Sequence, residues 1–130
     1  MRKKFEKNCV HELGLHLVFC PKYRKPIFTG IVEVELKHIL SQTCAEYGWG
    51  VEALEIMPDH VHLCASLPPK IPIHKLLKLA KGRSSNYLRK EFPHLLKMPT
   101  LWSRSYFATT VGDVSTEKVM EYIKKQWEKK

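Results

Sequence analysis

The chain has no long hydrophobic run. Its longest apolar stretch, residues 13–20, is interrupted by Gly14 and His16, whereas a membrane-spanning helix needs about 20 consecutive apolar residues. The basic residues 1–7 are not followed by the apolar segment and small-residue cleavage site of a secretory signal. We therefore expect a cytoplasmic protein that does not span a membrane.

Cysteine is scarce and not arranged in pairs. The four cysteines, Cys9, Cys20, Cys44 and Cys64, form no CxxC pair and lie singly in apolar segments. This spacing disfavours a zinc ribbon and indicates reduced, mostly buried thiols.

Acidic residues are the minority charge, with 13 Asp and Glu against 22 Lys and Arg, a net charge of +9. The resulting positive field favours polyanionic partners, nucleic acid first. The alternative is a lysine-rich surface that serves solubility. An anionic membrane is disfavoured as a partner because the cations are spread along the chain and are not confined to one amphipathic helix.

Hydrophobic periodicity predicts seven elements in the order β, α, β, β, α, β, α. We expect strands over 13–19, 49–56, 60–67 and 106–111, and helices over 32–47, 73–88 and 115–127. Residues 22–26 are predicted to be a basic loop. Gly48 is a good C-terminal cap, and Gly82 suggests a break or a close approach in the middle of its helix.

This order is typical of an α+β, ferredoxin-like (split βαβ) antiparallel sheet with an extra C-terminal helix. We find no repeats or linker and expect a single domain over residues 1–130. Helices on one face of such a sheet leave the other face free for a partner or ligand.

His60 and His62 lie two residues apart in a predicted strand, so their imidazoles point to the same face, where one divalent ion could bind both. If Pro58 and Asp59 form a two-residue turn, Glu55 faces His62 across the hairpin. Glu55 could then bind the metal or accept the second N–H of an imidazole. The alternative is a turn histidine and a hydrogen-bonded core histidine without a metal.

Tyr122 and Gln126, spaced i and i+4, share one face of the last predicted helix. A phenol and an amide would therefore face the same partner. The alternative is that Tyr122 packs at the edge of the core while Gln126 is solvated.

With these motifs in this order, the chain resembles the small single-tyrosine HUH transposases of insertion-sequence-200-type elements. The resemblance spans nearly the whole chain and includes KYR at 22–24, MPDHVH at 57–62, KGRSS at 81–85, LW at 101–102 and EYIKKQ at 121–126. It implies that His60 and His62 are the HUH metal pair, that Tyr122 is the nucleophile, and that Gln126 completes the metal site.

The resemblance also implies a substrate and an assembly. Such transposases act on single-stranded DNA with hairpin element ends through a 5′-phosphotyrosine, as dimers, with no small-molecule substrate. Magnesium or manganese is the implied ion, although the ligand types alone would tolerate zinc. Cations that track phosphates and aromatic rings that stack on bases are the physical requirement. The candidates are Lys22, Tyr23, Arg24, Lys25, Lys81, Arg83 and Arg104, for each of which an ordinary solvated side chain is the alternative.

Two other functions stay open at this point. A ferredoxin-like sheet with basic surroundings also describes noncatalytic binders of single-stranded RNA, although no aromatic-rich strand of that consensus is present. The other is a related HUH nickase, a class usually embedded in longer chains.

Overall fold

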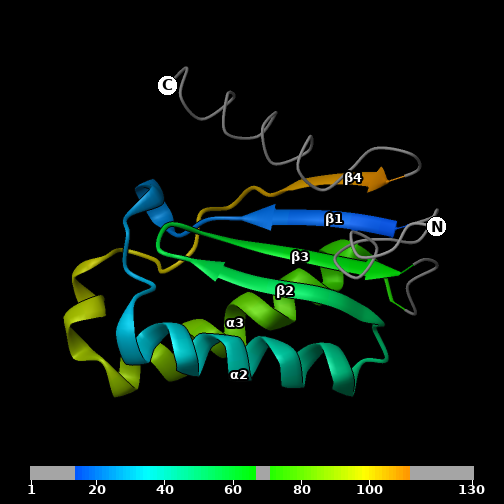
Figure 1. The fold of residues 1–130 in the computed structure, drawn as a ribbon. Helices are drawn as coiled ribbons and strands as arrows, with labels where there is room; N and C mark the ends of the chain where they lie inside the picture. Colours follow the sequence, from blue (N-terminus) through cyan, green and yellow to red (C-terminus); the bar gives the residue numbers. More distant parts are fainter. Residues whose placement is uncertain (1–13, 67–70, 112–130) are drawn as a thin grey trace.

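The structure is a computed structural model that describes residues 14–66 and 71–111. Along the chain it contains β1 (Gly14–Phe19), η1 (Lys22–Arg24), α2 (Gly30–Glu46), β2 (Val51–Met57), β3 (His60–Ser66), α3 (Ile73–Glu91), η2 (Pro93–Lys97) and β4 (Phe107–Val111) (Figure 1). The helix predicted over 115–127, with Tyr122 and Gln126, lies outside the described residues. Within those residues, no helix is long and apolar enough to cross a membrane.

The four strands form one sheet in the order β2-β3-β1-β4, and each neighbouring pair is antiparallel. β1 and β2 therefore run in the same direction with β3 between them, which is the split βαβ arrangement. Helices α2 and α3 lie together on one side of the sheet (Figure 1). The predicted α+β fold, an antiparallel split βαβ sheet with two helices on one face, is confirmed for the described residues.

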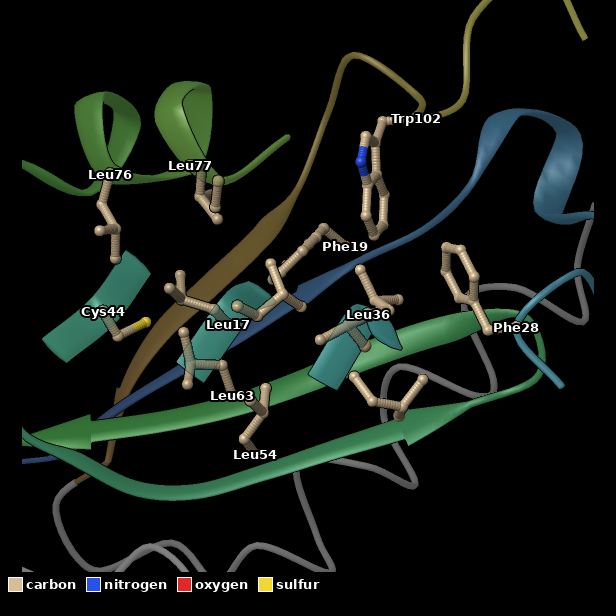
Figure 2. Close-up of a cluster of buried hydrophobic side chains, with 14 of the residues drawn as sticks. Leu17, Phe19, Phe28, Leu36, Cys44, Leu54, Leu63, Leu76, Leu77 and Trp102 are labelled. Carbon is tan, nitrogen blue, oxygen red and sulfur yellow. The ribbon is translucent and has the colours of Figure 1, made fainter. Parts of the chain in front are cut away.

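The core lies between the sheet and the two helices. Leu17 and Phe19 of β1 and Leu63 of β3 point into it, together with Leu36 of α2 and Leu77 of α3 (Figure 2). Because strand side chains alternate, the residues between these strand positions point to the opposite face. His16 and His62 therefore emerge on the face of the sheet away from the helices.

Trp102 joins the end of β1 to α3. Its ring lies 5.2 Å from that of Phe19 and 5.1 Å from that of Phe28. The indole Nε1 donates a hydrogen bond of 3.0 Å to Oγ of Ser84, which in turn donates to the carbonyl of Ala80. Ser84 and Trp102, from two of the motif stretches quoted above, therefore connect α3 to the end of β1 through the core.

Local predictions were met at Gly48 and missed at two other sites. Gly48 follows Tyr47, the C-cap residue of α2, and has φ +72°, as the residue after a C-cap often requires. The break expected at Gly82 is wrong, because α3 continues through it. A close approach is not found either: apart from its chain neighbours and the surrounding helix backbone, no described atom lies within 4 Å of where its Cβ would be. The basic loop 22–26 contains a 3₁₀ turn that the sequence did not predict.

Candidate metal centre

The β2–β3 hairpin sets the geometry of the HxH motif. Met57 pairs with His60 and Glu55 pairs with His62, so residues 58–59 form the expected two-residue turn. His60 and His62 therefore lie on the same face of β3, with the Glu55 side chain beside them on β2.

His62 is almost fully buried, with 2% of its surface exposed. Burial lowers its pKa more than the neighbouring Glu55 carboxylate raises it, so the imidazole is neutral at neutral pH. Its Nδ1 lies 3.4 Å from Oε1 of Glu55. Since an ionised carboxylate can only accept, Nδ1 carries the proton and Nε2 keeps its lone pair. This is the arrangement by which carboxylates orient metal-binding histidines.

His16 and Cys64 were not predicted as site residues, yet they complete a cluster with His62. His62 Nε2 lies 3.2 Å from His16 Nδ1 and 3.7 Å from Cys64 Sγ, and the sulfur lies 3.8 Å from His16 Nδ1. Burial and the adjacent His62 lower the pKa of His16 to about 4. Across residues 14–66 and 71–111, this is the one group of three or more side chains placed to hold a metal ion.

The pairing of β1 with β3 explains the cluster. His16 lies opposite Cys64, and Val18 lies opposite His62, so His62 is the diagonal neighbour of His16 on the same face. One sequence signal was available, because His16 alternates with Leu15 and Leu17 and must face away from the core.

His60 lies at the start of β3 and is not a member of that cluster. Its Nδ1 is 3.0 Å from Oδ1 of Asp59, whose Oδ2 accepts a 2.8 Å hydrogen bond from Arg24. Burial raises the pKa of Asp59, but the hydrogen bonds from His60 and Arg24 outweigh it, and the pKa is lowered. The carboxylate therefore stays ionised and fixes the His60 ring.

The basic turn of residues 22–25 packs against this end of the hairpin. Besides the Arg24–Asp59 pair, the Phe28 amide donates to the Pro58 carbonyl at 3.0 Å. Tyr23 and Arg24 have φ of 58° and 51°, a conformation that costs energy for residues with a side chain. The Tyr23 ring is 70% exposed. The turn thus presents an exposed aromatic ring next in sequence to Arg24, the residue that pairs with Asp59.

The other predicted nucleic-acid contacts lie on and around α3. The Lys81 ammonium donates to the Ser103 carbonyl at 3.0 Å, and Lys81 and Arg104 line a groove between α3 and residues 100–106. Arg83 instead forms a 2.8 Å ion pair with Glu46 of α2. Lys81 and Arg104 are therefore brought together, whereas Arg83 is held against α2.

The donors on this face of the sheet are compatible with a divalent metal. Neutral imidazole is a common ligand, and the carboxylate that orients His62 is the usual outer-shell partner. Tyr122 and Gln126 lie outside the described residues, so the structure does not locate them.

The described residues thus form an α+β domain whose antiparallel, split βαβ sheet carries His60 and His62 on the face away from α2 and α3, an arrangement compatible with a metal site. The model of the family described as "Transposase IS200 like" matches residues 9–126, and the chain belongs to this family. The resemblance found in the sequence is thereby confirmed.

Two curated relatives cover almost the whole chain. The ISDra2 transposase TnpA of Deinococcus radiodurans is 34% identical over 99% of this chain and 94% of its own length. The transposase for insertion sequence element IS200 of Salmonella typhimurium is 33% identical over 95% of this chain and 84% of its own length.

Solved structures agree with this assignment. A crystal structure of a candidate transposase from Deinococcus radiodurans is 35% identical, with a TM-score of 0.74 over 97% of this chain and 98% of that chain. A tyrosine transposase bound to a REP hairpin is 14% identical, with a TM-score of 0.56 over 94% of this chain and 66% of that chain. At this identity, the second likeness shows the fold alone.

Proposed function

We propose that this chain is a transposase that cleaves and rejoins single-stranded DNA at insertion-sequence ends through Tyr122. The observation that carries the proposal is the placement of His60 and His62 on one face of β3, beside Glu55, in a chain of the IS200-like family. Hairpin DNA is the proposed substrate, as in the related structure bound to a REP hairpin.

His60, His62 and Gln126 are the proposed metal ligands, with Glu55 in contact with His62 rather than with the ion. Its 3.4 Å approach to His62 Nδ1 supports this outer-shell role. When bound, a divalent ion such as magnesium or manganese stabilises negative charge on the scissile phosphate. Asp59 keeps the His60 ring in place through its Nδ1.

Tyr122 is the proposed nucleophile. A phenol has a pKa of about 10 and needs help to ionise at neutral pH. The Tyr122 phenol gives up its proton to solvent and its oxygen attacks phosphorus. The bond from phosphorus to the 3′ oxygen breaks, and that oxygen leaves with the electron pair and takes up a proton from solvent. The resulting 5′-phosphotyrosine lets a different 3′-OH reverse the step, so cutting and joining need no external energy source.

The basic turn and the groove are the proposed path of the DNA strand. Lys22, Arg24 and Lys25 would meet phosphates while Tyr23 stacks on a base. Lys81, Arg83 and Arg104 would extend this surface, although Arg83 must then share its charge with Glu46. We further propose that the protein is a homodimer and works in the cytoplasm.

The test is a covalent-trapping assay. Full-length protein is incubated with manganese and single-stranded DNA from the flanks of its own gene. The amount of SDS-resistant protein–DNA adduct is then quantified. The proposal predicts a metal-dependent adduct that Tyr122→Phe and His62→Ala abolish. Tyr87→Phe is the matched control and should retain the adduct, since Tyr87 lies on α3 and donates to Glu35. DNA binding without any adduct would favour the noncatalytic module.

A further inference from the structure

We propose that His16, His62 and Cys64 form a zinc site, distinct from the HUH site, and that zinc bound there withdraws His62 from the catalytic metal centre. The withdrawal of His62 rests on the proposed function. The zinc site itself rests on the geometry of the cluster alone.

The three atoms that face one another already have the spacing of zinc ligands. Tetrahedral zinc, with Zn–N of about 2.0–2.1 Å and Zn–S of about 2.3 Å, separates two nitrogens by about 3.3 Å and a nitrogen from a sulfur by about 3.6 Å. In the structure, His16 Nδ1 and His62 Nε2 are 3.2 Å apart, and Cys64 Sγ lies 3.8 Å and 3.7 Å from them. An ion could therefore enter with shifts of only tenths of an ångström.

The chemistry of the donors favours zinc over magnesium or manganese. A thiolate is a soft ligand, and two imidazoles with one thiolate suit zinc, whereas the harder ions prefer oxygen. The three protein ligands leave one position for a water. All three side chains are at most 2% exposed, so the cluster lies in a low-dielectric setting where the bond between metal and thiolate is strong.

Binding changes the protons of the cluster in a defined way. Without metal, His16 Nδ1 donates to His62 Nε2, because Glu55 accepts the other proton of His62. With zinc, the remaining proton of His16 sits on Nε2 and the thiol proton of Cys64 passes to solvent. One proton is released per zinc.

The conflict with the HUH site arises at a single nitrogen. Nδ1 of His62 faces Glu55, so Nε2 is the nitrogen left for any metal. In the cluster this nitrogen points at His16 and Cys64, and one lone pair cannot serve two ions. The HUH site needs His60 but not Cys64, whereas the zinc site needs Cys64 but not His60.

This difference gives a crossed test with cobalt as the spectroscopic substitute for zinc. Metal-stripped full-length protein receives one equivalent of Co²⁺, and absorption is recorded for the thiolate-to-cobalt charge-transfer band. We expect the band in the wild type and in His60→Ala. Cys64→Ser should abolish it, whereas the matched control Cys20→Ser should keep it. Circular dichroism verifies that each variant is folded. A folded wild type without the band, or a band that survives Cys64→Ser, would overturn the zinc site.

A second arm tests the withdrawal of His62. Protein preloaded with one equivalent of zinc is given manganese and single-stranded DNA, and adduct formation is compared with the zinc-free protein. The wild type should lose about tenfold or more, because outer-shell changes alone cost about 10- to 100-fold, while Cys64→Ser should be little affected. Equal inhibition of both proteins would contradict the withdrawal. A chain that forms no adduct even without zinc would refute the proposed function, while the cobalt spectrum still reports on the site.

Discussion

The Glu55 carboxylate lies 3.4 Å from Nδ1 of His62, its partner across the β2–β3 hairpin. This contact fixes which nitrogen of His62 is available to a metal. Because the Glu55 side chain is 57% exposed, it can be changed with little effect on packing.

Glu55→Ala should therefore weaken metal binding without unfolding the protein. Loss of an outer-shell carboxylate typically costs about 10- to 100-fold in metal affinity. Isothermal titration of the metal-stripped protein with manganese measures this directly. Glu33→Ala removes the same charge from the exposed surface of α2 and is the control. Equal affinities for wild type and Glu55→Ala would mean that Glu55 does not support the ligand.

Because His16 is buried, we expect the free energy of unfolding to depend on pH. Its pKa is 6.5 in the unfolded chain and about 4 in the folded protein, so between these values the unfolded state binds more protons. Stability is then fully present above pH 6.5 and is lost as the pH falls to about 4. The loss is about 3 kcal/mol, and little more follows below pH 4.

Urea unfolding of the chelator-treated protein across this pH range checks the prediction. His16→Gln should reduce the pH dependence, with the buried His62 supplying what remains, whereas His38→Gln, at an exposed position on α2, should leave the profile unchanged. An unfolding free energy that stays constant from pH 7 to pH 4 in the wild type would be inconsistent with a neutral, buried His16.

Ser84→Ala should destabilise the fold through Trp102. The substitution leaves the buried indole Nε1 without the hydroxyl that it bonds at 3.0 Å. A buried donor without an acceptor costs about 1–3 kcal/mol. Thermal or urea unfolding measures the change, with Ser85→Ala, one residue further along α3, as the control. If the Ser84→Ala protein is as stable as the control, the hydrogen bond contributes nothing to the stability of the fold.

Lys22 and Lys25 should contribute to DNA binding through phosphates. For single strands, each neutralised phosphate adds about 0.7 to the slope of log affinity against log salt. The double variant Lys22→Ala with Lys25→Ala should therefore reduce that slope by about 1.4. Fluorescence anisotropy with a labelled single-stranded oligonucleotide gives the slope. Removal of the exposed Lys37 and Lys90 tests whether net charge alone explains the result, and an identical reduction in both double variants would argue against specific phosphate contacts.

The strands and the hairpin register could be predicted because their signals are local. Alternation of apolar residues defined β1 and β3, and residues 58–59 fixed Glu55 opposite His62. The cluster of His16 with Cys64 could not be predicted in the same way, since it depends on pairing between strands 48 residues apart. At Gly82, the packing of Leu77, Ala80 and Leu88 in the core overrode a weak helix propensity.

Transposition as proposed requires that Tyr122 become covalently joined to a 5′ phosphate. Its most direct test is mass spectrometry of the protease-digested adduct formed with manganese and a single-stranded oligonucleotide of known sequence. We expect the peptide containing Tyr122 to carry the nucleotides 3′ of the cut, joined through a 5′ phosphate, while the other fragment ends in a free 3′-OH. Nucleotides attached to any other residue, or joined to Tyr122 through a 3′ phosphate, would contradict this expectation.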